Sequence, residues 1–100
     1  MLVIPTLPVI ASFRHRGLKR LYEKGDRSRI NPAHLERIEL ILSDLEVAGT
    51  IDHMRQPGYR LHVLRGPLAG YYAIVVSGNW RIVFRFEGGD AIDVDLVDYH

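Results

Sequence analysis

The spacing of apolar residues predicts a short strand and then a helix near the start of the chain. Residues 9–13 (VIASF) fit the strand. In residues 16–24 three apolar positions share one side of a helix, and they are Leu18, Leu21 and Tyr22. Gly25 follows at a position where a helix C-cap favours the left-handed conformation, so we expect the helix to end there.

A second and clearer helix is predicted after Asn31. Asn31 is a favoured N-cap residue, and Pro32 fits the first helical position. The apolar positions that follow recur at spacings of three and four, and they are Leu35, Ile38, Ile41, Leu42 and Leu45. The charged positions between them are expected to face water, and they are Glu36, Arg37, Glu39 and Asp44. Residues 48–50 (AGT) are expected to end this helix.

After Pro57-Gly58 the apolar period changes to two, which predicts strands. Alternation runs through residues 59–64, 80–86 and 91–97, and residues 71–76 are apolar almost throughout, as in a strand covered on both faces. Turn sequences at 77–78 (SG) and 88–90 (GGD) separate the last three strands, so we expect an antiparallel meander. The predicted fold is therefore α+β, in the order β-α-α-β-β-β-β, with the two helices packed on one face of an antiparallel twisted sheet.

The chain has 100 residues, which suits one domain, and no cysteine, which excludes disulfides and thiolate metal sites. No apolar run approaches the roughly 20 residues of a membrane-spanning helix. The apolar start lacks a basic region and contains Pro5 and Pro8, so it is interpreted as an extended lead-in and not as a signal peptide. We therefore expect a cytoplasmic protein.

The net charge of +1 hides a strong segregation of charge along the chain. Residues 14–29 hold seven basic and two acidic side chains, and residues 55–85 hold five arginines and no acid. Residues 30–54 hold five acids and one arginine, and residues 86–100 hold five acids and no Lys or Arg. The basic blocks could attract a phosphate backbone, but a solvated surface of alternating charge explains them equally well.

A set of residues suited to phosphodiester chemistry falls on the predicted strands 59–64, 80–86 and 91–97 and just after them. Its members are His62, Arg65, Arg81, Arg85, Asp98, Tyr99 and His100. Cleavage of RNA without a metal needs a base for the 2′-OH, a cation for the phosphate and an acid for the leaving 5′ oxygen. Histidine can be the acid or the base, and arginine can hold the phosphate in a two-pronged contact.

Each of these residues also has an ordinary structural interpretation. A strand histidine often only packs, and exposed arginines are usually solvated. The series Asp90, Asp93, Asp95 and Asp98 could form a metal site, but its spacing matches no recognised loop. Asp98 and His100 also share the alternation of the apolar positions 92, 94 and 96, so a bend or bulge near Val97 is expected if the chain end is to join the other residues.

Five blocks of the chain resemble the HigB-type toxins of the RelE superfamily. They are 12–19 (SFRHRGLK), 59–66 (YRLHVLRG), 70–72 (GYY), 77–82 (SGNWRI) and 98–100 (DYH). The likeness covers residues 9–100, which are expected to form a single domain, and leaves residues 1–8 as an N-terminal extension. It implies the toxin of a type II toxin–antitoxin pair that cleaves mRNA in the ribosomal A site, without a metal or other cofactor. It also implies a helix-turn-helix antitoxin of the HigA type as partner, and operator DNA bound only through that antitoxin.

The resemblance also assigns roles by position. His100, assisted by Asp98, is expected to be the base, and His62 the acid or a second proton-transfer group. Arg65 and Arg81 are expected to hold the phosphate, and Tyr99 to stack on the nucleotide or orient it. Val63 and Arg65 depart from the family block, which has proline and lysine there, and an arginine at position 65 is a poor general acid.

A basic surface for RNA or the ribosome is predicted from Arg14, Arg16, Lys19, Arg20, Arg60 and Arg85. Two other functions stay open at this point. One is a non-catalytic module of the same fold that acts through its antitoxin and operator. The other is a metal-dependent nuclease that uses the aspartates near the chain end.

Overall fold

The structure is a computed structural model that describes residues 9–99. The suggested extension, residues 1–8, and the expected base His100 lie outside the described residues. The elements follow one another as α1 (Arg16–Lys24), α2 (Pro32–Val47), the 3-10 turn η1 (Ile51–Met54), β1 (His62–Val63), the 3-10 turn η2 (Gly66–Leu68), β2 (Tyr72–Ser77), β3 (Trp80–Glu87) and β4 (Asp90–Asp98). This order confirms the predicted α+β class.

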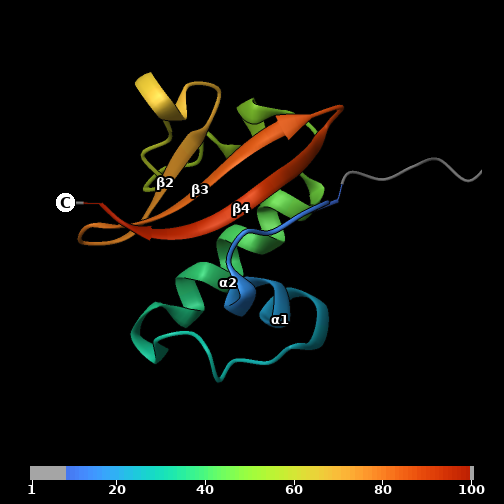
Figure 1. The fold of residues 1–100 in the computed structure, drawn as a ribbon, viewed down its shortest axis with the longest axis vertical. Coiled ribbons are helices and arrows are strands. Elements are labelled where there is room, and N and C mark those ends of the chain that lie inside the picture. The colour runs from blue at the N-terminus through green and yellow to red at the C-terminus, as the bar shows by residue number, and fades with distance from the viewer. Residues whose placement is uncertain (1–8, 100) are drawn as a thin grey trace, which may run out of the picture.

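The four strands form one antiparallel sheet in the order β1-β2-β3-β4, and both helices lie on one of its faces (Figure 1). The strand predicted at residues 9–13 is present only as isolated parallel bridges, in which Ile10 and Phe13 meet β4. The N–H groups of Ala11 and Arg14 donate to carbonyl oxygens of β4 at 2.8 and 2.9 Å. This segment therefore covers backbone groups at the β4 edge of the sheet, which would otherwise be open to another chain.

Both helices begin and end close to the predicted residues. His15 is the N-cap of α1, and its Nδ1 accepts a hydrogen bond from the Leu18 N–H at 3.1 Å. Gly25 ends α1 in the left-handed conformation, with φ 66°. Asn31 caps α2, because its Oδ1 accepts from the Ala33 N–H at 2.9 Å.

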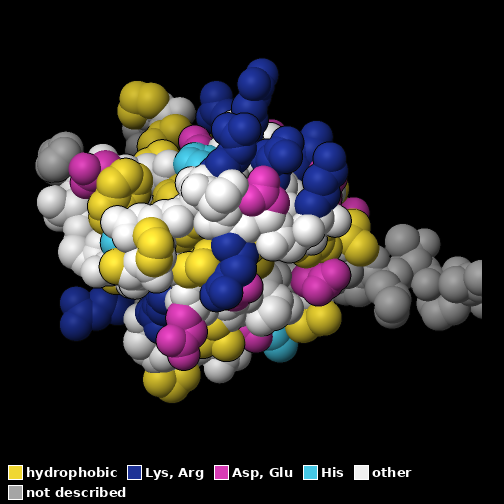
Figure 2. Space-filling view, turned by 90° about the horizontal axis from the view of Figure 1, so that it is seen from below, with side chains coloured by type: hydrophobic (Ala, Val, Ile, Leu, Met, Phe, Trp, Pro, Cys, Tyr) yellow, Lys and Arg dark blue, Asp and Glu magenta, His cyan; other side chains and the backbone are white. Residues whose placement is uncertain are grey.

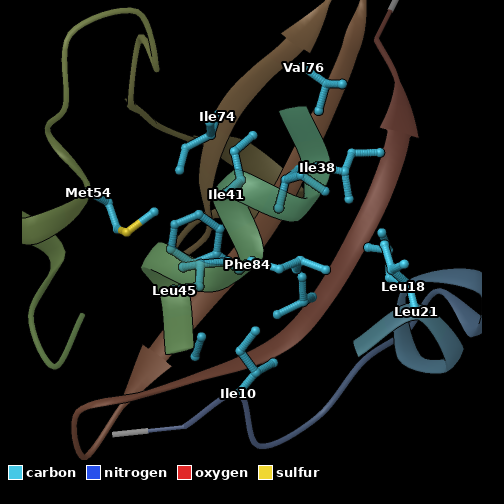
Figure 3. Packing of buried hydrophobic residues seen from close by; sticks show 14 of the residues in the cluster. Ile10, Leu18, Leu21, Ile38, Ile41, Leu45, Met54, Ile74, Val76 and Phe84 are labelled. Carbon is cyan, nitrogen blue, oxygen red and sulfur yellow. The ribbon is translucent and has the colours of Figure 1, made fainter. Parts of the chain in front are cut away.

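The core lies between the helices and the facing side of the sheet (Figure 3). Phe84 of β3 is fully buried at its centre, with the rings of Tyr72 and Phe86 at 5.9 and 5.6 Å. All five apolar positions predicted for the second helix are buried. Since each large apolar side chain contributes roughly 1.5–3 kcal/mol when it is fully buried, this face of α2 fixes the helix against the sheet.

The strand predicted over residues 59–64 is much shorter than expected. Only His62 and Val63 form β1, because Arg60 adopts a left-handed conformation with φ 50°, which an extended strand does not accommodate. The alternation predicted over residues 59–64 puts Tyr59 and Val63 on one face of a strand. Tyr59 is buried (2% exposed) whereas Val63 is 62% exposed, so this prediction was wrong. The segment before β1 thus turns into the protein at Tyr59, where it keeps a backbone hydrogen bond to β2, from the Val75 N–H to the Tyr59 carbonyl oxygen at 3.0 Å.

A β-bulge in β4 shifts the alternation of that strand. Val83 pairs with Asp95 and Arg85 with Ile92, so Asp93 and Val94 together lie opposite one residue of β3. Asp93 has φ 53°, and its N–H donates to the Ser12 hydroxyl at 2.8 Å. As a result Ala91 and Val94 are both buried, and Ile92 no longer shares their face.

Beyond this bulge the pairing of β3 with β4 is regular as far as Trp80 and Asp98. The bend expected near Val97 is therefore absent, and the irregularity lies four residues earlier. Because side chains alternate along a strand, Asp98 takes the face of Trp80, which stacks with His34 of α2, and Val97 takes the face of Arg81.

Candidate functional site

A surface pocket of about 340 Å³ opens on the sheet face away from the helices, at the β1 side. It is lined by His62, Val63, Leu64, Arg65, Ala73, Arg81 and Tyr99. Four of the residues predicted for catalysis therefore meet in one hollow: His62, Arg65, Arg81 and Tyr99. They come from β1, the turn after it, β3 and the residue after β4.

Strand register explains why residues so far apart in sequence share this pocket. His62 pairs with Ala73 of β2, and Val75, two residues further, pairs with Arg81 of β3. Positions two apart on a strand share a face, so His62 and Arg81 point to the same side of the sheet. Strand spacing and rise put their Cα atoms about 12 Å apart, which leaves room for a phosphate between two long side chains.

Ala73 belongs to this site, although the sequence analysis did not single it out. It is buried between His62 and Val83, its partners in the register, and its small side chain leaves the floor of the pocket open. The feature that could have revealed it is the one small residue in the otherwise large apolar run of residues 71–76.

The Arg81 guanidinium is held from behind by the backbone of the turn between β2 and β3. Its Nη1 donates to the carbonyl oxygens of Gly78 at 2.6 Å and Trp80 at 3.0 Å. A guanidinium has five N–H groups, so Nε and Nη2 retain three donors for a ligand. Arg81 is therefore a fixed cation at the wall of the pocket with donors to spare.

The end of the chain is anchored as far as Tyr99. Its N–H donates to the carbonyl oxygen of Asn79 at 2.7 Å, and Figure 1 shows the end of β4 beside the turn between β2 and β3. The Tyr99 side chain is 41% exposed, so its ring is open to a base that enters the pocket. Asp98 is exposed and does not line the pocket, and the register places it on the opposite face.

The predicted basic residues divide between two places. Arg16, Lys19 and Arg20 line a second hollow on α1, together with Glu23 and Lys24, and Lys and Arg side chains gather over part of this helical face in Figure 2. Arg14 is exposed just before α1. Arg60 and Arg85 lie away from this surface, in the loop before β1 and on β3.

Two of the predicted RNA-binding arginines already contact carboxylates. Arg85 lies 3.4 Å from Glu87 and 3.5 Å from Asp93, and its guanidinium stacks over the Tyr71 ring at 5.5 Å. Arg20 pairs with Asp26 at 2.9 Å. Hydrogen bonds from Ser28, and then from Arg20, hold the pKa of Asp26 well below its usual range. Arg16 and Lys19 form no ion pair with another of residues 9–99, so they are the more available cations of α1.

Two charged residues of α2 do not face water as predicted. Arg37 and Asp44 are half-buried and contact Tyr59. The Asp44 carboxylate accepts a short hydrogen bond from the Tyr59 hydroxyl. Burial, and then this hydrogen bond, raise the pKa of Tyr59 well above its usual range. The prediction failed because helical spacing alone does not show what a later loop brings against the helix.

Within residues 9–99, no group of three or more His, Asp or Glu side chains is arranged so that it could hold a metal ion. The helices of the same residues include none with the length and apolar character needed to cross a membrane.

Comparison with known proteins agrees with this fold. Residues 11–100 match the family described as the RelE-like toxin of the type II toxin–antitoxin system HigB. The chain belongs to this HigB toxin family. It is 41% identical over 92 residues to "Endoribonuclease HigB" of Proteus vulgaris, which covers 92% of this chain and all of that protein. It is 30% identical over 86 residues to "Toxin HigB-1" of Vibrio cholerae, which covers 84% of this chain and 90% of that protein.

Membership of the HigB family confirms the resemblance found in the sequence. It implies an antitoxin as partner, since the family is that of type II toxin–antitoxin systems. The predicted class of enzyme, an endoribonuclease, agrees with the name of the Proteus relative.

Proposed function

We propose that this HigB toxin is a ribosome-dependent endoribonuclease that cleaves mRNA in the A site by attack of the 2′-OH on the neighbouring phosphate. The observation that carries the proposal is the pocket that brings His62, Arg65, Arg81 and Tyr99 together. The name of the Proteus relative, an endoribonuclease, supports the same activity.

In the proposed reaction the 2′ oxygen loses its proton to a base and attacks phosphorus. The bond from phosphorus to the 5′ oxygen breaks, and that oxygen takes a proton from an acid. The products are a 2′,3′-cyclic phosphate and a 5′-OH. We assign the base to His100 and the acid to His62, because histidine exchanges protons near neutral pH. Asp98, which the register places on the other face of the sheet, is given no part in this step. Each such group contributes roughly 10²–10⁴-fold to the rate.

Arg65 and Arg81 hold the phosphate and stabilise the charge that builds on it in the transition state. An arginine does not readily give up a proton, so neither residue is assigned as the acid. Tyr99 stacks on the base next to the scissile bond, which fits its exposed ring, because unpaired RNA bases commonly stack on aromatic side chains.

The ribosome presents the single-stranded substrate, and the basic surface of α1 supplies a grip on ribosomal RNA. Phosphate backbones attract clustered Lys and Arg side chains, of which Arg16 and Lys19 are the most available here. We further propose a HigA-type antitoxin with a helix-turn-helix as the partner, operator DNA bound through that antitoxin, and the cytoplasm as the site of action.

The test is primer extension on mRNA in programmed ribosomes, with analysis of the product ends. The wild-type protein should produce a cut in the A-site codon that leaves a 5′-OH, and His62→Ala should slow it by roughly 10²-fold or more. His53→Ala is the matched control, because His53 is an exposed histidine of η1 that does not line the pocket. Equal rates for the two variants would refute the role of His62.

A non-catalytic module of the same fold remains the other outcome of this experiment. It predicts that the wild-type protein leaves mRNA intact while it still binds its antitoxin. Cleavage by the wild-type protein that is lost in His62→Ala excludes it.

A further inference from the structure

The strand that carries His62 is too short to hold itself in place. β1 has two residues, both exposed, and lies at an edge of the sheet. It pairs only with β2, through His62 to Ala73 and Val63 to Tyr72. Edge segments with few buried contacts are the parts of a protein that open most easily. Something else must therefore fix this segment.

The chain just before β1 is fastened much more firmly. Tyr59 is 2% exposed, and its carbonyl oxygen accepts from the Val75 N–H of β2 at 3.0 Å. Its hydroxyl donates to the Asp44 carboxylate of α2. Hydrogen bonds to charged groups are among the stronger ones in proteins, and a partly buried one is little weakened by water.

Arg37 of α2 also binds the segment before β1, and its guanidinium lies over the Tyr59 ring. Its guanidinium carbon lies 4.9 Å from the centre of the Tyr59 ring. Its Nη2 donates to the carbonyl oxygen of Gly58 at 2.5 Å, and the same nitrogen and Nε donate to that of Val75 at 3.2 and 3.3 Å. One arginine of α2 thus links that helix both to β2 and to the segment that precedes β1.

We propose that Arg37, Asp44 and Tyr59 form an anchor through which α2 positions β1, and with it His62, opposite Arg81. Tyr59 lies three residues before His62, and the left-handed Arg60 between them sets the direction of the chain. None of the three residues of the anchor lines the pocket, so they are positioning residues. The inference rests on the proposed function for its effect on the rate, and on geometry alone for its effect on His62.

The test compares two tyrosines that each donate to a carboxylate of α2. Tyr59→Phe removes the hydrogen bond to Asp44. Tyr22→Phe removes the hydrogen bond of 3.0 Å from Tyr22 of α1 to Glu46 of α2. Tyr59→Phe should lower the cleavage rate on saturating programmed ribosomes by roughly tenfold to a hundredfold, because small displacements of catalytic groups are costly. The ribosome concentration that gives half the maximal rate should change less than twofold. Tyr22→Phe should change neither quantity.

A second pair of variants separates positioning from loss of structure. Asp44→Asn keeps an oxygen that accepts the hydroxyl hydrogen bond and should keep most of the rate, whereas Asp44→Ala should match Tyr59→Phe. The imidazole resonances of His62, read by NMR in the absence of ribosomes, should shift in Tyr59→Phe and Asp44→Ala and stay unchanged in Tyr22→Phe.

Unchanged rate and unchanged His62 resonances in Tyr59→Phe would overturn the anchor, and so would equal effects of the two tyrosine variants. A wild-type protein that cleaves nothing would instead refute the proposed function. In that case the His62 resonances still decide whether the anchor positions β1.

Discussion

Replacement of Arg81 tests how the pocket recognises phosphate. Both N–H groups of Arg81 Nη1 donate hydrogen bonds to the carbonyl oxygens of Gly78 and Trp80. The three N–H groups on Nε and Nη2 remain available for phosphate. Arg81→Ala removes these donors and the charge. Arg81→Lys keeps the charge but has three N–H groups in all, so one is left for phosphate if two bind the same carbonyls.

The expected loss follows from this count of donors. Removal of one preorganised donor to a transition-state oxyanion typically costs about 10²–10³ in rate. We therefore expect Arg81→Ala to lose at least this much, and Arg81→Lys to lose roughly tenfold, because a point charge replaces a planar fork. Stability should change little, by about 1 kcal/mol, since water can take over carbonyls of an exposed turn.

The assay is the single-turnover cleavage rate on programmed ribosomes, with thermal unfolding as the check on stability. Arg55→Ala is the matched control, because it removes one exposed arginine that pairs with Asp52 and does not line the pocket. Arg81→Ala within twofold of wild type would refute a role in binding phosphate. If Arg81→Lys cleaves as slowly as Arg81→Ala, the argument that the one donor left on lysine preserves part of the rate is refuted.

Three further outcomes follow from other parts of the structure. Arg65→Lys should keep the cleavage rate within a few fold and Arg65→Gln should lose it, because lysine keeps the positive charge and is the residue of the HigB family block at this position. Equal rates for both variants would contradict this. Lys19→Glu together with Arg16→Glu should weaken ribosome binding and reduce the slope of binding affinity against salt concentration. An unchanged salt titration would exclude a role of the basic surface of α1 in binding ribosomal RNA. The Tyr59 pKa is raised above the value of about 10 in the unfolded chain, so its contribution to stability is complete below that pH and is lost as pH rises above it. Urea denaturation should therefore show a smaller loss of stability above pH 10 in Tyr59→Phe than in wild type.

The helices could be predicted from local sequence because their determinants are local. Asn31, Pro32 and Gly25 act within one turn of the helix ends, and the apolar spacing of the second helix needs no knowledge of the rest of the chain. The strand order also followed from turn sequences between alternating segments. The chemistry of the side chains singled out the residues of the site, and the resemblance to the HigB family then matched them by position. Four of them meet in one pocket.

The parts that sequence did not predict depend on contacts between distant segments. The bulge at Asp93 is fixed by the Ser12 hydroxyl, 81 residues earlier, so period-two alternation could not show it. The bulge shifts the phase of the strand, which leaves Asp98 on the face of Trp80 and lets Tyr99 line the pocket. Arg37 and Asp44 were assigned to solvent because Tyr59 reaches them only in the folded chain.

The most direct test of the central claim uses the substrate and not the protein. Programmed ribosomes carry an mRNA in which the nucleotide before the scissile phosphate has a 2′-deoxy sugar. The attacking oxygen is then missing, while the ribosome, the codon and the pocket stay the same. The proposed reaction predicts no cut at this bond, with a normal cut in the matched all-ribose mRNA. Cleavage of the deoxy substrate at a similar rate would contradict attack by the 2′-OH.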